Sequence, residues 1–213
     1  TAYEIPKRDW SSDVVLFRSA IESVYAKPYI LHASMGPSCA IAELKSRQLT
    51  VWTHSQGVYP LRGALASVLG MKPESIRCIH VEGAGCYGHN AADDVALDAA
   101  LLARAFPGKP VRVQWHRDDE HGWEPFSTPM VVTTRAALGR DGKVADWRMD
   151  LWSHNHGQRP QALPDSSSLL AAGSLEKAWG PTTKRPSAGK EGGEHRNAWP
   201  GYDFDAPTVV KHF

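Results

Sequence analysis

The sequence lacks an excess of charge of either sign. Its 213 residues include 24 lysines and arginines and 23 aspartates and glutamates, giving a formal net charge of +1. Nucleic acids and anionic membrane surfaces attract proteins that carry a clear positive excess. The charge balance therefore gives no support to nucleic acid or a lipid surface as a partner.

Long apolar runs and paired cysteines are also missing. No apolar run approaches the roughly 20 residues of a membrane span, and no signal peptide is visible. The three cysteines, Cys39, Cys78 and Cys86, are odd in number and lack metal-ligand spacing, which argues against a disulfide framework and a zinc site. The chain starts with Thr1 rather than Met, so we expect a processed form or a fragment. Its cellular location is left open.

The first three quarters of the sequence contain the patterns of hairpins and helices. Alternating apolar residues predict strands, two pairs of which form hairpins, and a 3.6-residue period predicts helices. The expected strands are 14–17, 29–32, 40–44, 49–54, 75–81, 111–115, 130–138 and 144–152, and the expected helices are 59–69 and 91–106. This mixture predicts an α+β fold with mixed or antiparallel sheets and packed helices.

The composition changes near residue 157. Proline, glycine and serine become dense beyond this point, and the apolar periodicity disappears. Such composition is typical of extended or partly disordered segments. We therefore expect an α+β domain over residues 1–156 and an arm over residues 157–213.

A glycine-rich loop lies between the expected strand 75–81 and the helix that follows. It contains Gly83, Gly85 and Gly88, whose backbones can adopt positive φ and allow a ligand to approach closely. Asn90 is a plausible N-cap of the helix, and the free N–H groups of a helix start favour electron-rich ligands. The loop is the first place at which we expect binding. By contrast, Asp118, Asp119 and Glu120 are expected in a solvated turn.

Two other interpretations of this loop remain open. Gly83-x-Gly85-x-x-Gly88 matches the dinucleotide fingerprint of a Rossmann-type NAD- or FAD-binding dehydrogenase domain. However, Glu82 would face the pyrophosphate with like charge, and polar residues interrupt the preceding strand. A non-catalytic interaction module is the other alternative. Parallel, neighbouring strands at 75–81 and 110–115 would favour the dinucleotide site.

A series of landmarks over roughly residues 28–155 carries a more specific resemblance. They are His32 to Pro37, His54-Ser55-Gln56, Leu69-Gly70, Gly83 to His89, and Lys109 to Asp118. In order and spacing they resemble the molybdenum-binding large subunit of the xanthine oxidase and aldehyde oxidoreductase family. Gly36 and the variant loop Gly85-Cys86-Tyr87-Gly88 resemble the branch of nicotinate dehydrogenase and isoquinoline 1-oxidoreductase large subunits.

This resemblance implies a reaction, cofactors and partners. The expected enzyme hydroxylates an electron-poor carbon of an N-heteroaromatic compound or an aldehyde, with water as the oxygen source, and passes electrons to 2Fe–2S clusters. The implied cofactor is molybdopterin, in the cytosine dinucleotide form that is usual in bacteria. The implied partners are an iron–sulfur small subunit, the remainder of the large subunit, a small-molecule substrate and a cytochrome acceptor. The family's catalytic glutamate motif is absent here, so we expect an internal fragment that is inactive alone.

The resemblance also implies site residues. Gln56 matches a glutamine whose amide hydrogen-bonds a molybdenum oxo group, and the main chain of Gly85, Cys86, Tyr87 and Gly88 matches the cofactor-binding turn. His89 and Asn90 match substrate-pocket positions, and no side chain is expected to bind the metal directly. Tyr87 stands where glycine is usual, so we expect the turn to follow a different path. Gln56 as a plain strand-end residue and Asn90 as a plain N-cap remain alternatives.

Overall fold

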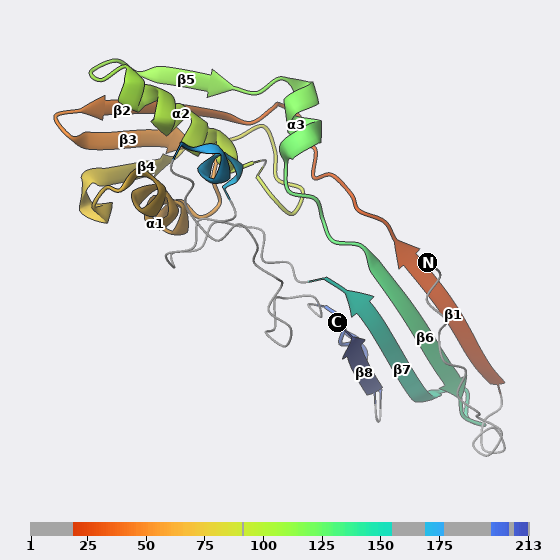
Figure 1. Cartoon of the computed structure of the whole chain (residues 1–213). Coiled ribbons are helices and arrows are strands. Elements are labelled where there is room, and N and C mark those ends of the chain that lie inside the picture. The colour runs from red at the N-terminus through yellow and green to blue at the C-terminus, as the bar shows by residue number, and fades with distance from the viewer. Residues whose placement is uncertain (1–18, 91, 155–168, 177–196, 205–206, 213) are drawn as a thin grey trace. The chain divides into compact units, whose positions relative to one another are not determined.

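The computed structural model describes residues 19–90, 92–154, 169–176, 197–204 and 207–212 (Figure 1). The chain forms two compact units. One consists of Tyr29–Ser127 with Gly157–Ala188, and the other of Thr1–Pro28, Thr128–His156 and Gly189–Phe213. No helix among the described residues is long and apolar enough to cross a membrane.

The first unit is built on a four-stranded mixed sheet. Its strands are β2 (Cys39–Lys45), β3 (Gln48–Thr53), β4 (Ile76–His80) and β5 (Val111–Gln114), in the order β4-β3-β2-β5. β2 is antiparallel to β3 and β5, whereas β4 is parallel to β3. Ser46 and Arg47 turn the β2–β3 hairpin with φ of 49° and 65°, as a type I′ turn requires.

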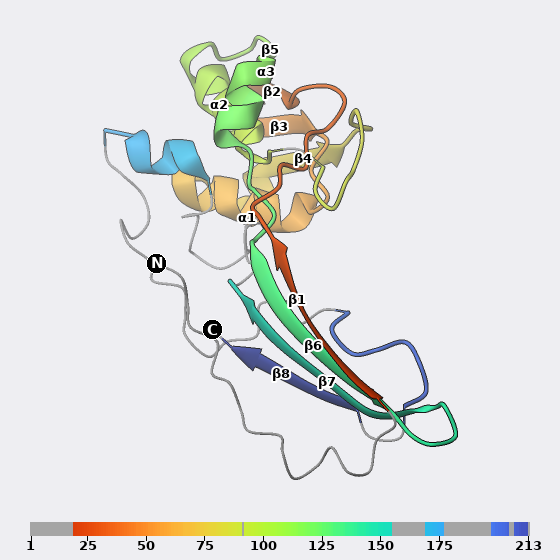
Figure 2. The same ribbon diagram turned by 90° about the vertical axis from the view of Figure 1, so that its right-hand side faces the viewer.

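Two helices cover one face of this sheet, α1 (Val58–Leu69) and α2 (Asp94–Ala105) (Figure 2). Alternation along the strands directs Ala42 and Val51 into the core beneath the helices, where both are fully buried. Ile41 and Trp52 are neighbours on the opposite face and are only half-buried. The first unit also contains α3 (Arg117–Trp123) and the short 3-10 helices η2 (Pro73–Ser75) and η3 (Leu170–Ser174).

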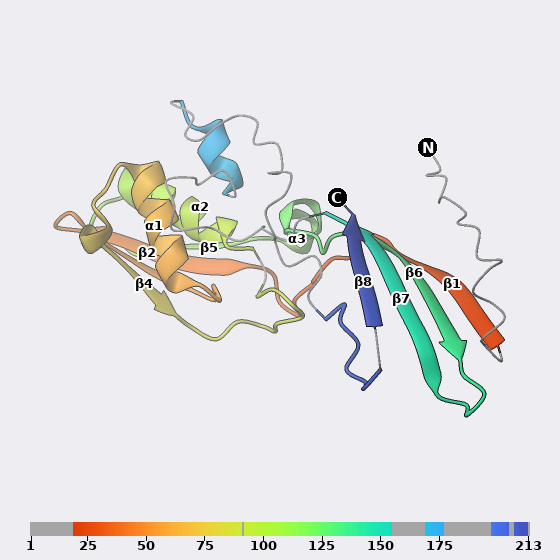
Figure 3. The ribbon, with the colours of Figure 1, turned by 90° about the horizontal axis from the view of Figure 1, so that it is seen from below.

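The second unit is a four-stranded sheet, visible in Figure 3. Its strands are β1 (Ser19–Lys27), β6 (Met130–Leu138), β7 (Val144–Ser153) and β8 (Pro207–His212), in the order β1-β6-β7-β8. β6 is antiparallel to β1 and β7, and β8 is parallel to β7. Trp152 and His212 stack across the β7–β8 pair with ring centroids 4.4 Å apart.

The α+β prediction is confirmed by these two mixed sheets and their packed helices. The dinucleotide-binding alternative is wrong, because β4 and β5 lie at opposite edges of their sheet rather than side by side. Such an arrangement has no parallel β4–β5 crevice in which a Rossmann fold would bind its ligand.

Several local expectations also differ from the structure. Asn90 is not the N-cap of α2, which begins at Asp94 after Asp93. The expected strand 29–32 contributes only an isolated bridge between Ile30 and Ser127. The expected strand 14–17 lies outside the described residues, as does much of the arm 157–213. Within that arm the structure describes η3 and the paired strand β8, and the boundary at residue 156 stays a prediction.

Candidate functional site

The glycine-rich loop leaves β4 and turns back before α2. Positive φ occurs at Gly85 (138°) and Gly88 (97°), whereas Tyr87 is not among the residues with positive φ. The ring of Tyr87 folds over Gly85, so that a Cβ at position 85 would lie 3.0 Å from the Tyr87 hydroxyl oxygen. The turn therefore accommodates tyrosine without placing it in a left-handed conformation.

The structure brings Gln56 to this turn. Gln56 follows the end of β3, and its Oε1 accepts a hydrogen bond from the backbone N–H of Asn90 at 3.1 Å. Its Nε2 donates to the Sγ of Cys86 at 3.5 Å. Both contacts are solvent-exposed, so the carboxamide and the turn share one accessible edge of the unit.

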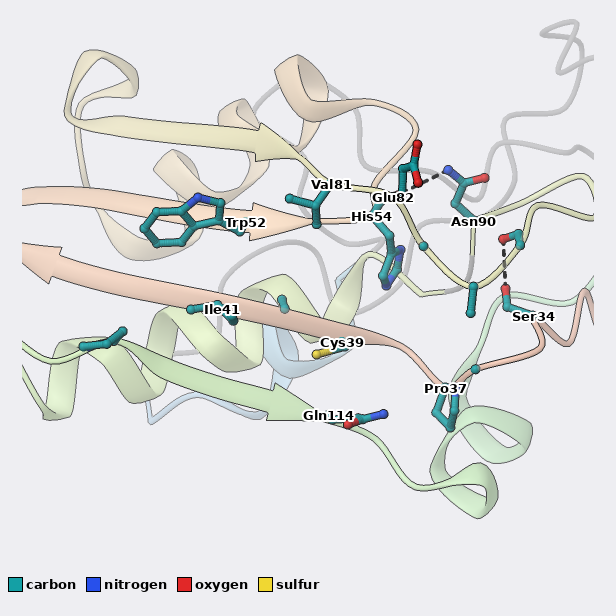
Figure 4. A pocket seen from close by; sticks show the side chains of 16 residues that line it. Ser34, Pro37, Cys39, Ile41, Trp52, His54, Val81, Glu82, Asn90 and Gln114 are labelled. Carbon is teal, nitrogen blue, oxygen red and sulfur yellow. Dashed lines mark hydrogen bonds between the residues drawn. The ribbon is translucent and has the colours of Figure 1, made fainter.

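Asn90 joins the turn to the end of β3. Its Nδ2 donates to the backbone carbonyl of His54 at 3.0 Å, a bond drawn in Figure 4. This use of the side chain explains why Asn90 does not cap the helix. The backbone N–H of Val81 also donates to Thr53 O at 2.9 Å, so both limbs of the loop are tied to β3.

His89 faces the interior rather than solvent. Only 6% of the residue is exposed, and its ring lies 5.5 Å from the ring of His32 between centroids. His89 Nε2 is 3.8 Å from Asp93 Oδ2. The predicted roles of His89 and Asn90 in a substrate pocket stay predictions.

A buried carboxylate on α3 links the segment before β2 to the segment before α2. Glu120 on α3 is fully buried and accepts hydrogen bonds from Ser38 N (2.7 Å) and Ser38 Oγ (3.0 Å). Ser38 Oγ in turn accepts the N–H of Ala92 at 2.8 Å, just before α2. The expectation that Glu120 lies in a solvated turn is therefore wrong.

Glu124 repeats this arrangement one helical turn later. Its Oε1 accepts the backbone N–H groups of His32 (2.6 Å) and Ala33 (3.0 Å). The spacing of Glu120 and Glu124 places them on one side of α3, facing the segment 32–38. Sequence reasoning placed Glu120 in solvent and did not single out Glu124.

A cavity of about 550 Å³ lies on the face of the sheet opposite α1 and α2 (Figure 4). Its lining includes Ile41, Trp52, His54, Gly83, Ala84 and Gln114. His54 is 6% exposed, and among the described residues neither of its ring nitrogens has a hydrogen-bond partner. Burial lowers the pKa of His54 from its ordinary value and so favours the neutral imidazole.

Close backbone contacts bring the loop against this part of the sheet. A Cβ at Gly83 would lie 2.8 Å from His54 Cβ, and a Cβ at Gly36 would lie 2.8 Å from Ala84 Cβ. Real side chains do not approach this closely, so both glycines are required for the observed packing. Gly36, which departs from the commoner family pattern, is thus explained by its contact with Ala84.

The exposed edge at the turn fits an electron-rich cofactor. Among the described residues the backbone N–H groups of Cys86 and Tyr87 have no acceptor, and Gln56 Nε2 has only a thiol sulfur at 3.5 Å. Both Cys86 and Tyr87 are exposed. Three N–H donors without a strong acceptor match the oxygen and sulfur atoms of a molybdopterin group.

Comparisons with known proteins identify the family of the chain. Residues 13–174 match the family described as the molybdopterin cofactor-binding domain. A nicotinate dehydrogenase subunit of Pseudomonas putida is 44% identical over 139 residues, which are 65% of this chain and 12% of that protein. The aldehyde oxidoreductase molybdenum-binding subunit PaoC of Escherichia coli is 30% identical over 155 residues, 72% of this chain and 21% of that protein.

Solved structures share the fold. An aldehyde oxidoreductase from Desulfovibrio gigas has a TM-score of 0.59 at 17% identity, covering 70% of this chain and 16% of that one. Quinoline 2-oxidoreductase from Pseudomonas putida has a TM-score of 0.59 at 17% identity, covering 69% of this chain and 19% of that one. Because the family match spans most of the sequence, this chain belongs to the molybdopterin cofactor-binding domain family, among the molybdenum-binding subunits of xanthine oxidase-type enzymes.

Proposed function

We propose that this chain contributes part of the cofactor site of a molybdenum hydroxylase acting on an N-heteroaromatic compound, with nicotinate as the first candidate. The observation that carries the proposal is the convergence of Gln56 with the turn 85–88 on one exposed edge. The 44% identity to a nicotinate dehydrogenase subunit supports the choice of substrate. Isoquinoline-like compounds and aldehydes are the alternative substrates.

The chain's own groups would bind and orient the cofactor. When bound, molybdopterin supplies two-electron redox chemistry at its metal. Gln56 Nε2 would donate a hydrogen bond to the cofactor, and the N–H groups of Cys86 and Tyr87 would donate from the main chain. Gly85 and Gly88 allow this main chain to turn through positive φ. Donors held in place before the reaction stabilise negative charge without the cost of reorganising water.

His89 and Asn90 are proposed to shape the substrate pocket from beneath the turn. His89 is buried and Asn90 is tied to His54, so both act through the position of the loop. Asn90 also brings no carboxylate to this position. A substrate that needs a carboxylate at position 90 as its hydrogen-bond acceptor is therefore disfavoured.

The remaining parts of the enzyme are proposals as well. The chain spans 12% to 21% of the length of the curated relatives described above. We propose that the rest of the large subunit, an iron–sulfur small subunit with 2Fe–2S clusters and a cytochrome acceptor complete the enzyme. The cofactor is proposed to be the cytosine dinucleotide form of molybdopterin.

The test is to express the full-length subunit with its iron–sulfur partner and to measure molybdenum content and substrate oxidation. Nicotinate, isoquinoline and an aldehyde are each supplied as the substrate, together with an artificial electron acceptor, and their oxidation rates are compared. The reaction converts R–H and water into R–OH, two electrons and two protons, so ¹⁸O from labelled water should enter the product. Absence of molybdenum, under conditions that load a known relative, would contradict the proposal.

A further inference from the structure

We infer that Asn90 is a positioning residue that sets the direction of the Gln56 carboxamide. The inference rests on the proposed function, because it concerns which end of this amide is offered to a cofactor. It goes beyond the proposal by giving Asn90, besides its place at the substrate pocket, a second role that is exerted through Gln56.

The chemistry of the contact decides the direction of the amide. A carboxamide has an accepting oxygen at one end and a donating NH₂ at the other, and the two ends are easily exchanged. A backbone N–H can only donate. Because the Asn90 N–H points at the Gln56 side chain at 3.1 Å, the atom that faces it must be Oε1. The NH₂ group is therefore directed to the turn at Cys86.

The Asn90 side chain holds that backbone N–H in place. Its Nδ2 donates to His54 O at 3.0 Å, immediately after β3. Gln56 is only two residues further along the same segment. The bond to His54 therefore holds the Asn90 N–H at a fixed position relative to Gln56 Oε1. The close contact of Gly83 with His54 keeps the glycine-rich loop against the segment that follows β3.

A reversed amide would place NH₂ against N–H. Two donors would then face each other, the Asn90 N–H would lose its acceptor, and the turn would meet an oxygen instead of a donor. The observed direction is favoured by a factor on the order of ten, from the worth of one hydrogen bond. Loss of the Asn90–His54 bond should release this preference.

The experiment uses the full-length enzyme with its iron–sulfur partner and the variants Asn90→Asp and Gln56→Ala, singly and together. Asp keeps the size of Asn but cannot donate to His54 O. Removing Gln56 should lower kcat on the order of a hundredfold, as loss of one preorganised donor does. Asn90→Asp should lower kcat about twofold with little change in KM, because the share of Gln56 amides in the productive direction falls from about nine tenths to about one half. In the Gln56→Ala background it should have no further effect on kcat, because residues that act through one group are not additive.

A second measurement is independent of activity. A crystal structure of the Asn90→Asp protein should show residue 56 without its single ordered position against the residue 90 N–H. Asn90→Ala serves as a second variant in case the aspartate disturbs folding. Gln56→Glu keeps an acceptor for the Asn90 N–H and removes the donor, so it should stay ordered yet lose kcat as Gln56→Ala does.

His80→Ala is the matched control. His80 Nδ1 lies 3.0 Å from Ser55 O, so this variant also removes a side-chain bond to the same segment without touching the carboxamide. It should leave kcat unchanged. Equal effects of Asn90→Asp with and without Gln56, or an ordered and unmoved Gln56 in that variant, would overturn the inference. Unchanged kcat in Gln56→Ala would instead overturn the proposed role of Gln56 itself.

Discussion

Gly36 and Ala84 meet where the segment before β2 crosses the glycine-rich loop. A Cβ at position 36 would lie 2.8 Å from the Ala84 Cβ, closer than two such carbons pack. The pair joins two of the sequence landmarks that indicated the family, 32–37 and 83–89. Position 36 must therefore be glycine as long as position 84 carries the methyl group of alanine.

Gly36→Ala should therefore destabilise the protein by about 1–3 kcal/mol, the usual cost of overpacking. The measurement is the free energy of unfolding in urea. Adding Ala84→Gly should recover most of the loss, because it removes the atom that the new Cβ meets. Gly122→Ala is the control, since a Cβ there meets nothing within 4 Å. A double variant no more stable than Gly36→Ala would show that the contact is not the cause.

Glu120→Ala should destabilise the protein by about 3 kcal/mol. The substitution removes two hydrogen bonds to a buried charged group and leaves the Ser38 N–H without its acceptor. Urea unfolding measures the loss. The exposed neighbour Asp118→Ala should change stability by less than about 0.5 kcal/mol. Similar effects at the two positions would contradict the network.

Asp94 should make the protein less stable as the pH rises toward 7. Burial raises the pKa of Asp94 to about 7 from its ordinary value of 3.8, although Leu170 N donates to its Oδ1 at 2.7 Å. The folded state therefore holds this proton more tightly than the unfolded state. The stabilisation is complete below about pH 4 and is lost as the pH rises through 7, a change on the order of 4 kcal/mol.

Asp94→Asn tests this dependence, because the amide cannot ionise. Unfolding free energies measured at steps between pH 4 and pH 8 should fall for the parent protein and fall much less for the variant. Asp118→Asn, at an exposed position, should leave the slope of the parent unchanged. A parent protein whose stability rises steadily over this range would refute the assignment.

The parts of the fold that local patterns specify were predictable. Both hairpins and both long helices follow from alternation, helical periodicity and terminal glycines such as Gly70, which ends α1 with φ of 63°. β1 was missed because seven of its nine residues are exposed, so apolar alternation never marks one buried face. β8 was missed because its strand character comes from pairing with β7, more than fifty residues earlier in the chain.

The candidate site was predictable in its members but not in its connections. The order of landmarks pointed to Gln56 and the turn 85–88, and the structure places them within hydrogen-bond reach. No sequence pattern shows that Asn90 turns its side chain back to His54 instead of capping α2. Glu120 was misjudged because a run of three acidic residues suggests solvent, whereas its burial depends on the distant Ser38.

The parallel pairing of β8 with β7 has a practical consequence for truncated forms of this protein. A boundary placed before Pro207 would leave the peptide groups on one side of β7, from Trp147 to Trp152, without their strand partner. Trp152 would lose the imidazole stacked on it, and Asp150 would lose the ring nitrogen of His212 at 3.0 Å. An open strand of this kind readily recruits another chain. Aggregation of such a shortened form would thus report a missing neighbour rather than an inherent weakness of the sheet.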